Sequence, residues 1–299
     1  MDYNYEKVRF NIESLEESFK NLTDENLKRI ANVAIENINQ IAITIALPHY
    51  LMMRGVMNIK HFQYLLEAAV ATKNELQPKS VKGKKQIEEY IKLKFEENKK
   101  YHSEEGRELL SRLRSKSPYI EEAIRIQALN SLVNVWTVFE STSKEIWMSI
   151  LNNYQDKFVN NIIESKTDED VEGIIGKSIS INLLGKYNFN VNKKLGNILS
   201  GKYDFTSCSG IKKAFIDLDR TQKDSLNFLD ESNLVKFENL RNLIVHKAGI
   251  IDDLYIKKNA LPNESLGKKI IVNTGEYQTY IQAVISPIIK LFEFSDSIK

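Results

Sequence analysis

The chain has 299 residues, 42% of them hydrophobic, which is enough to bury a substantial core in one large domain or two ordinary ones. Its 42 Lys and Arg residues nearly balance 40 Asp and Glu residues. The resulting net charge of +2 excludes the broad positive field of a dedicated duplex-DNA binder. Any contact with nucleic acid should therefore be local.

Cysteine content and the first residues bear on the compartment. Cys208 is the single cysteine, so an intrachain disulfide and a cysteine-rich zinc site are both excluded. The segment MDYNYEKVRF is acidic and polar, without the apolar stretch of a signal peptide. We therefore expect a soluble protein in a reducing, cytoplasmic compartment.

Glycine and proline are scarce, which predicts an all-α fold with long helices. The chain contains 12 Gly and 5 Pro residues to interrupt regular structure. Its most apolar segment, Ile41–Met53, is shorter than the roughly 20 residues of a membrane-spanning helix and contains Pro48 and His49. We expect this segment to lie in the core, and we expect no membrane association.

Three helices are predicted in the N-terminal part. The first runs from an N-cap at Thr23 to about Pro48, because apolar residues recur there every three or four positions. The second covers residues 57–76 and the third covers residues 82–117. Charges alternate in sign along the third helix, which is typical of a solvated face; a surface for RNA or a regulatory partner is the alternative.

A domain boundary is predicted at residue 117. Ser117 is a capping residue, and Pro118 suits the first turn of a following helix. The sequence thus predicts an N-terminal helical domain over residues 1–116, with a regulatory or partner-binding role. A helical bundle should follow over residues 117–299, with at most a short β element near residues 265–277.

The helix predicted at residues 121–154 should supply the core of the second domain. Its apolar and polar residues fall on different sides at helical spacing. The apolar stripe comprises Leu129, Leu132, Val133, Trp136, Phe139, Ile146, Trp147 and Ile150, and the polar side comprises Asn130, Asn134, Thr137 and Glu140. Residues 210–229 and 276–294 also show helical patterns.

The segment NLRNLIVHKAG, residues 239–249, combines a helical pattern with an unusual arginine. Arg241 falls inside an apolar arc of Phe237, Leu240, Ile244, Val245 and Ala248. A guanidinium stays charged, so a buried Arg241 needs an acidic or phosphate partner. Asn242 and His246 are four residues apart and share a face. In a purely structural alternative, Arg241 pairs with a carboxylate such as Glu140, and His246 caps its helix.

The hexapeptide RNLIVH resembles the R-x4-H signature of the HEPN superfamily. The motif is followed by KAGIIDD, by the extended piece LGKKIIV and by a closing helix, as in several bacterial HEPN families. The upstream helix SLVNVWTVFESTSKEIW also resembles the first long helix of those families, with Glu140 where an acidic residue often lies. The resemblance covers approximately Ser117 to the C-terminus.

The resemblance implies a bundle that dimerises about the motif helix and acts as a metal-independent endoribonuclease. It implies that Arg241 holds the scissile phosphate, that His246 is the general acid or base, and that Asn242 orients the phosphate or the imidazole. Glu140 would support the site through an ion pair. No cofactor is expected, and the products would be a 2′,3′-cyclic phosphate and a 5′-hydroxyl.

The same resemblance suggests a biological setting and a dimeric site. RNA would be the substrate, and the protein would act as a toxin or anti-phage abortive-infection effector, with a cognate inhibitor or a phage-derived activator. Arg241 and His246 point about 140° apart on an ideal helix, which favours a composite site at a homodimer interface. The rival hypotheses are a non-catalytic HEPN module that binds RNA or nucleotide, and a regulatory adaptor.

Other conspicuous residues are assigned no site. His49, His61 and His102 lie in separate segments without metal-ligand spacing, so no metal is expected. The segment GIIGKS, residues 173–178, lacks the spacing of a phosphate-binding loop. The tyrosines of the N-terminal part, Tyr50, Tyr64 and Tyr90, are more typical of a core than of an RNA-stacking surface.

Overall fold

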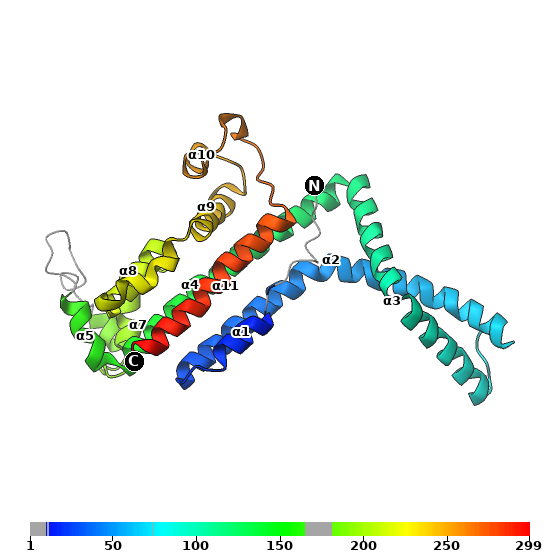
Figure 1. The fold of residues 1–299 in the computed structure, drawn as a ribbon, viewed down its shortest axis with the longest axis horizontal. Helices are drawn as coiled ribbons and strands as arrows, with labels where there is room; N and C mark the ends of the chain where they lie inside the picture. The colour runs from blue at the N-terminus through cyan, green and yellow to red at the C-terminus, as the bar shows by residue number, and fades with distance from the viewer. Residues whose placement is uncertain (1–9, 11, 74, 165–180) are drawn as a thin grey trace. The chain divides into compact units, whose positions relative to one another are not determined.

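The computed structural model describes residues 10, 12–73, 75–164 and 181–299 and confirms the predicted all-α fold (Figure 1). It is 82% helical, with 11 α-helices and no strand among these residues. The α-helices are α1 (Ile12–Phe19), α2 (Glu25–Thr72), α3 (Val81–Lys116), α4 (Pro118–Asn153), α5 (Gln155–Glu164), α6 (Ile181–Gly185), α7 (Leu195–Leu199), α8 (Cys208–Leu218), α9 (Ser232–Lys247), α10 (Asp253–Asn259) and α11 (Thr274–Ser297). Shorter 3₁₀ segments are η3 (Ser200–Lys202), η4 (Arg220–Asp230) and η5 (Asn263–Ser265).

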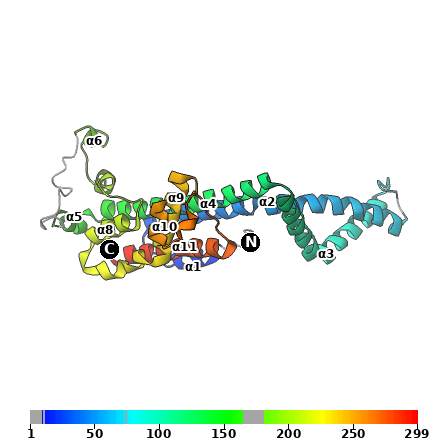
Figure 2. The ribbon, with the colours of Figure 1, turned by 90° about the horizontal axis from the view of Figure 1, so that it is seen from above.

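The chain divides into two compact units at positions that differ from the predicted division of 1–116 and 117–299. The first unit comprises residues 1–42 and 129–299, and the second comprises residues 43–128. Helix α1 and the part of α2 before residue 43 belong to the first unit because their apolar residues pack there. The rings of Phe19 and Phe292 lie 4.6 Å apart, and Figure 2 shows α1 beside α11.

Helix α4 forms the centre of the first unit, as its apolar stripe predicts. Trp136, Phe139 and Trp147 are fully buried, and among the predicted stripe only Val133 is half-exposed. The indole N–H of Trp147 donates to the carbonyl of Ala214 in α8, 2.8 Å away, so its one polar group is satisfied. Trp136 packs edge-to-face on Phe237 of α9. These contacts fix α8 and α9 against α4.

Helix α2 continues through Pro48, so the predicted stop there is wrong. A proline removes the hydrogen bond to the carbonyl four residues earlier, here that of Thr44. The side-chain amide of Gln127, in α4, donates to the Thr44 carbonyl at 2.6 Å and satisfies it. The N-cap also differs: Asp24, rather than Thr23, accepts from the backbone of Asn26 at 2.8 Å.

The prediction that Ile41–Met53 lies in the core holds for one face only. Ile41 and Ile45 are buried, whereas Ile43, Leu47 and Leu51 are about half-exposed. By length and composition α2 is apolar enough to cross a membrane, and 33% of its most apolar stretch is buried in the protein. Core helices of soluble proteins meet the same criterion, which therefore does not establish a membrane segment.

The second unit is built on a hairpin of α2 and α3. Tyr64 and Ala68 of α2 pack against Ile87 and Ile91 of α3 in a small apolar core. The Tyr64 hydroxyl lies 3.1 Å from Nε2 of the buried His102. Along the outer surface of α3, basic side chains and Glu form exposed pairs, for example Arg112 with Glu108. This arrangement is that of a solvated charged face; an RNA-binding role for it stays a prediction.

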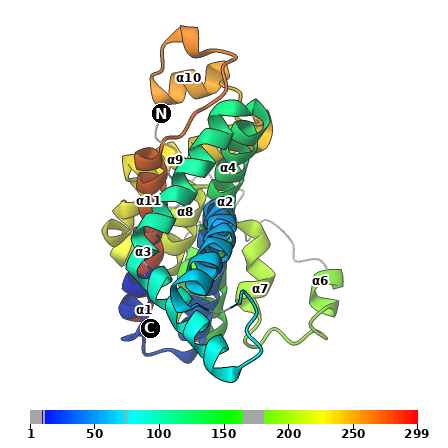
Figure 3. The same cartoon turned by 90° about the vertical axis from the view of Figure 1, so that its right-hand side faces the viewer.

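Helix α9 ends where the sequence places a glycine. Ala248 and Gly249 both adopt left-handed backbone conformations, with φ of 52° and 74°. The chain then reverses, and the amide of Ile251 donates to the carbonyl of Lys268 at 2.9 Å. An isolated antiparallel bridge between Ile250 and Lys269 is the short β element that was expected. Figure 3 shows α10 next to the end of α9.

We expect Gly210→Ala to lower the free energy of unfolding by about 2 kcal/mol, because the added methyl group overpacks a tight contact. A Cβ at Gly210 would lie 2.1 Å from the backbone oxygen of Asp204. Urea unfolding measures the loss. Gly201→Ala is the matched control, because no atom lies within 4 Å of a Cβ there. Equal stabilities of the two variants would contradict the prediction.

Candidate functional site

Helices α4 and α9 bring the predicted site residues together. Helix α9 carries Arg241, Asn242 and His246, and α4 carries Glu140 opposite Arg241. The side chains of Arg241 and Glu140 are 18% and 15% exposed, so this ion pair is largely withdrawn from solvent. The structure therefore contains the carboxylate partner that a buried arginine requires.

The guanidinium of Arg241 is held by two hydrogen bonds. Nη2 donates to Oε1 of Glu140 at 2.7 Å, and Nη1 donates to Oδ1 of Asn242 at 2.9 Å. The indole N–H of Trp136 donates to the same Glu140 oxygen at 2.7 Å. Nε of Arg241 is buried and has no hydrogen-bond partner among the described residues. Further N–H groups on Nη1 and Nη2 remain for a ligand.

Burial and neighbouring charges shift two carboxyl groups near Arg241. Burial raises the pKa of Glu140, and the attraction of Arg241 together with the Trp136 hydrogen bond only partly offsets this effect. Asp204 shows the opposite balance. Although burial alone would raise its pKa, hydrogen bonds from Ser207 and Thr206 and the charge of Arg241 lower it. Of these two carboxyl groups, Asp204 is therefore the one whose ionised form is favoured.

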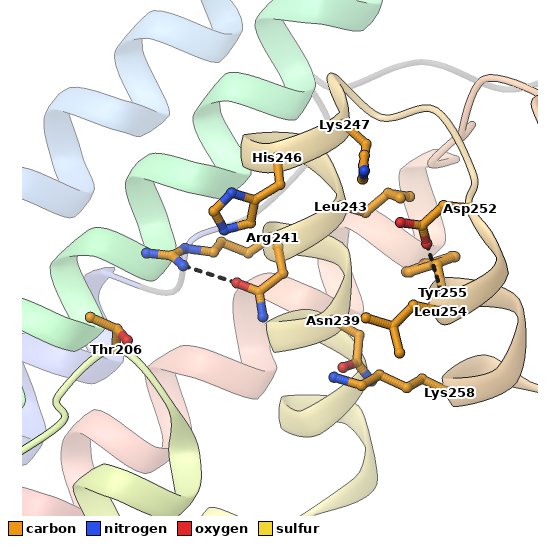
Figure 4. Close-up of a pocket in the computed structure, with 11 residues that line it drawn as sticks. Thr206, Asn239, Arg241, Leu243, His246, Lys247, Asp252, Leu254, Tyr255 and Lys258 are labelled. Carbon is orange, nitrogen blue, oxygen red and sulfur yellow. Dashed lines mark hydrogen bonds between the residues drawn. The ribbon is translucent and has the colours of Figure 1, made fainter.

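Arg241, Asn242 and His246 line one open pocket of about 430 Å³ (Figure 4). Figure 4 shows the ring of His246 turned toward the guanidinium of Arg241. The two side chains therefore converge within a single chain, in contrast to the divergence expected on an ideal helix. Arginine's long side chain accounts for the difference, because it can bend along the helix surface. The convergence weakens the geometric reason for a composite dimer site.

In the structure, His246 does not cap its helix, which is the role that the purely structural alternative gives it. His246 is exposed and makes no hydrogen bond among the described residues. The predicted apolar arc is partly wrong as well: Phe237, Leu240 and Ile244 are buried, but Val245 is half-exposed and Ala248 lies beyond the helix end. The last turn of α9 therefore faces solvent, and its imidazole is accessible.

The pocket also includes residues that sequence reasoning missed. Lys247 ends α9, Lys258 comes from α10, and Thr206 comes from the loop before α8. Asp252 lies on the same wall, but its carboxylate caps α10 by accepting from the backbone of Tyr255 at 2.8 Å. With Arg241, the lining carries three cationic side chains and one carboxylate, which favours an anionic ligand.

Among the described residues, the remaining candidates from the sequence form no further cluster of potentially reactive side chains. Within the described ranges, no three His, Cys, Asp or Glu side chains are grouped as metal ligands. Cys208 is buried, and burial raises the pKa of its thiol, with Glu238 contributing in the same direction. Such a thiol is inert rather than nucleophilic. GIIGKS, residues 173–178, lies outside the described residues.

In comparisons with known proteins, no protein-family model, no curated protein and no solved structure matches this chain.

We expect Glu140→Ala to destabilise the protein by about 2 kcal/mol, because it leaves the Arg241 charge and the Trp136 N–H without their acceptor. Glu140→Gln retains an acceptor oxygen and should cost about half as much. Urea unfolding at neutral pH compares the two variants. A Glu140→Ala variant as stable as the unsubstituted protein would show that the pair does not hold α4 and α9 together.

The raised pKa of Glu140 predicts a pH dependence of stability. Above pH 4.5, the ordinary pKa of this group, the unfolded chain releases the carboxyl proton of Glu140. Because the pKa is raised in the native state, the native state retains the proton over a further pH interval. The native state then binds more protons, so stability attributable to Glu140 should fall as pH rises through that interval. The unfolding free energy of the protein minus that of Glu140→Gln, followed from about pH 4 to pH 7, should decrease. An increase would reverse the assigned direction.

Proposed function

We propose that the chain is a HEPN-like, metal-independent endoribonuclease whose site comprises Arg241, Asn242 and His246. The observation that supports this proposal is their convergence on one open pocket, with Arg241 fixed by Glu140. The R-x4-H motif supplies the family assignment, and the pocket supplies a place where RNA could contact all three side chains. Glu140 acts as a positioning residue for Arg241.

The proposed reaction is transesterification at a phosphodiester. The ribose 2′-oxygen attacks phosphorus and loses its proton, while the bond to the 5′-oxygen breaks and that oxygen gains a proton. His246 transfers one of these protons, because an imidazole exchanges protons near neutral pH. Arg241 stabilises the charge that builds on the phosphoryl oxygens. The products are a 2′,3′-cyclic phosphate and a 5′-hydroxyl.

Asn242 has a more specific role in this proposal than the sequence suggested. Its carbonyl oxygen accepts from Nη1 of Arg241, so it fixes the second edge of the guanidinium. Its amide N–H₂ group is left to contact phosphate or the imidazole. A guanidinium held on two sides needs little reorganisation when charge develops, which is the usual source of electrostatic catalysis.

The main rival function is a non-catalytic HEPN module that binds RNA or a nucleotide, or a regulatory adaptor. The observation favouring this rival is the Arg241–Glu140 pair itself, because an ion pair at 2.7 Å between two packed helices also has a structural purpose. In this reading the pocket cations bind phosphate without cleaving it. The exposed His246 then has no chemical role.

The family resemblance also extends the proposal to partners and setting. We propose a cytoplasmic toxin or anti-phage effector that forms a homodimer about α9 and cleaves RNA. A cognate inhibitor or a phage-derived activator would control it, since an unregulated ribonuclease would damage its own cell. The second unit is the candidate for partner binding.

His246→Ala should abolish cleavage of total cellular RNA in EDTA, with at least a 100-fold loss of rate, because removing a general acid or base typically costs about 10²–10⁴-fold. The measurement is the mapping of cut ends, with cyclic phosphates expected from the unsubstituted protein only. His61→Ala is the matched control, because His61 is also exposed but belongs to the second unit and is not among the residues that line the pocket.

Binding measurements separate the two proposed functions. Phosphate-dependent RNA binding without cut ends, unchanged in His246→Ala and lost in Arg241→Ala, would establish the binding module. Equal cleavage by the unsubstituted protein and His246→Ala would overturn the catalytic assignment. Cleavage that requires added divalent cations would contradict the metal-independent mechanism.

A further inference from the structure

Helix α2 presents a long apolar face that the described residues leave about half-exposed. We define the α2 face by its large apolar side chains and the small or polar residues between them. The apolar members are Ile43, Leu47, Tyr50, Leu51, Ile59, Phe62 and Leu66, which are 43% to 67% exposed, and the others are Arg54, Gly55 and Asn58. Isolated exposed apolar residues are ordinary, but a contiguous face of this length marks an interaction surface.

These residues form ridges with a spacing of four. Leu47, Leu51, Gly55 and Ile59 make one row, and Arg54, Asn58, Phe62 and Leu66 make the adjacent row. Rows of residues four apart are the ridges that interdigitate when two helices cross at about −50°. The face is therefore shaped to receive another helix with the same ridge spacing.

The α2 face is complementary to itself about a point between residues 54 and 55. In an antiparallel pair centred there, Leu47 of one copy meets Phe62 of the other, and Leu51 meets Asn58. Ile43 and Leu66 lie about 70° from the line that faces the partner, and Tyr50 and Ile59 lie about 90° from it, so these four flank the contact. At about 100° per residue, Leu47, Leu51, Asn58 and Phe62 all fall within about 30° of the line that faces the partner.

At the centre of this arrangement, one edge of the face carries the small residue Gly55 and the other edge carries the charged residue Arg54. A Cβ at Gly55 would meet no atom within 4 Å, so the backbone there is open to close approach. Arg54 lies about 50° from the facing line, and its long side chain can carry its charge to solvent while its methylene groups cover apolar surface. The one charged residue of the central stretch therefore does not block the pairing.

The exposed area suits a dimer. With roughly 150–250 Å² for a fully exposed large side chain, the residues that can meet the partner present roughly 400–650 Å² per copy. They are Leu47, Leu51 and Phe62 at the centre of the face, and Ile43 and Leu66 at its edges. The smaller specific interfaces bury up to roughly 600 Å² per partner, so two copies of this face match the area of a small dimer interface.

A peripheral lipid surface is a poorer match for the α2 face than a second copy. Peripheral membrane helices combine an apolar face with many Lys and Arg residues along its edges. Residues 41–59 contain a single charged side chain, Arg54, and the same stretch includes Pro48. The basic flanks that would attach the helix to anionic lipid are missing from this part of α2.

We infer that the α2 face is a homodimer interface in which two copies of α2 pack antiparallel about Gly55. This interface is separate from the α9 contact invoked for the proposed ribonuclease, and it does not depend on that function. A second copy of the chain is its occupant.

Cysteine cross-linking tests the register. In full-length Cys208→Ser protein, the pair Leu51→Cys with Asn58→Cys should form disulfide-linked dimers on mild oxidation, because residue 51 of one copy faces residue 58 of the other. The two positions are about 10 Å apart along one helix, beyond the reach of a disulfide within the chain. Gln63→Cys with Val70→Cys has the same spacing outside the face and should stay monomeric on denaturing gels.

Sedimentation tests the energetics. Leu51→Glu should raise the dimer dissociation constant at least about 100-fold, since it buries an unpaired charge. Val70→Glu is the matched control, an exposed apolar position of α2 outside the face, and should leave the mass unchanged. Helical circular dichroism checks that both variants fold.

Three results would overturn the inference. One is a monomeric protein whose Leu51–Asn58 cysteine pair does not cross-link. Another is a dimer whose mass and dissociation constant are unaffected by Leu51→Glu, which would place the contact elsewhere. The last is a monomer that floats with phosphatidylcholine–phosphatidylserine vesicles and loses flotation in Leu51→Glu, which would assign the face to lipid.

Discussion

A largely buried guanidinium is the constraint around which the first unit is organised. Arg241 cannot lose its charge, so the apolar interface between α4 and α9 is tolerable only with Glu140 opposite it. The same carboxylate oxygen receives the Trp136 indole N–H, which ties the ion pair to the central aromatic core. A change at any one of these three residues therefore alters both packing and charge in the same place.

The demands of folding explain Arg241, Glu140 and Asn242 more fully than they explain His246. The first three satisfy one another through hydrogen bonds of 2.7 and 2.9 Å. His246 is exposed, stabilises no described neighbour by a hydrogen bond, and lies beside the fixed cation at the mouth of the pocket. A residue without a structural purpose at a pocket wall is a better indicator of function than a satisfied ion pair. The imidazole of His246 is therefore the strongest support for the catalytic proposal.

The sequence predicted those features that depend on local periodicity. The α4 stripe was recognisable because its apolar residues repeat at helical spacing, and the Arg241–Glu140 pair followed from the need of a buried charge for a partner. The continuity of α2 was not predictable in this way. Pro48 frees a carbonyl, and the group that satisfies it is Gln127, 83 residues away in the sequence. The observed division into units differs from the predicted one for the same reason, since it depends on contacts of residues 12–42 with residues that are far away in the sequence.

The small net charge conceals an uneven distribution that bears on how RNA would be attracted. Residues 43–128 contain 16 Lys and Arg against 11 Glu, a balance of +5, so the rest of the chain carries −3. The pocket with Arg241, Lys247 and Lys258 thus belongs to the more acidic part. Its attraction for phosphate must act at short range, because the surrounding charge opposes it and salt screens it beyond about 10 Å. Recognition by this pocket would then depend on close contacts with one phosphate, rather than on a field that gathers RNA from a distance.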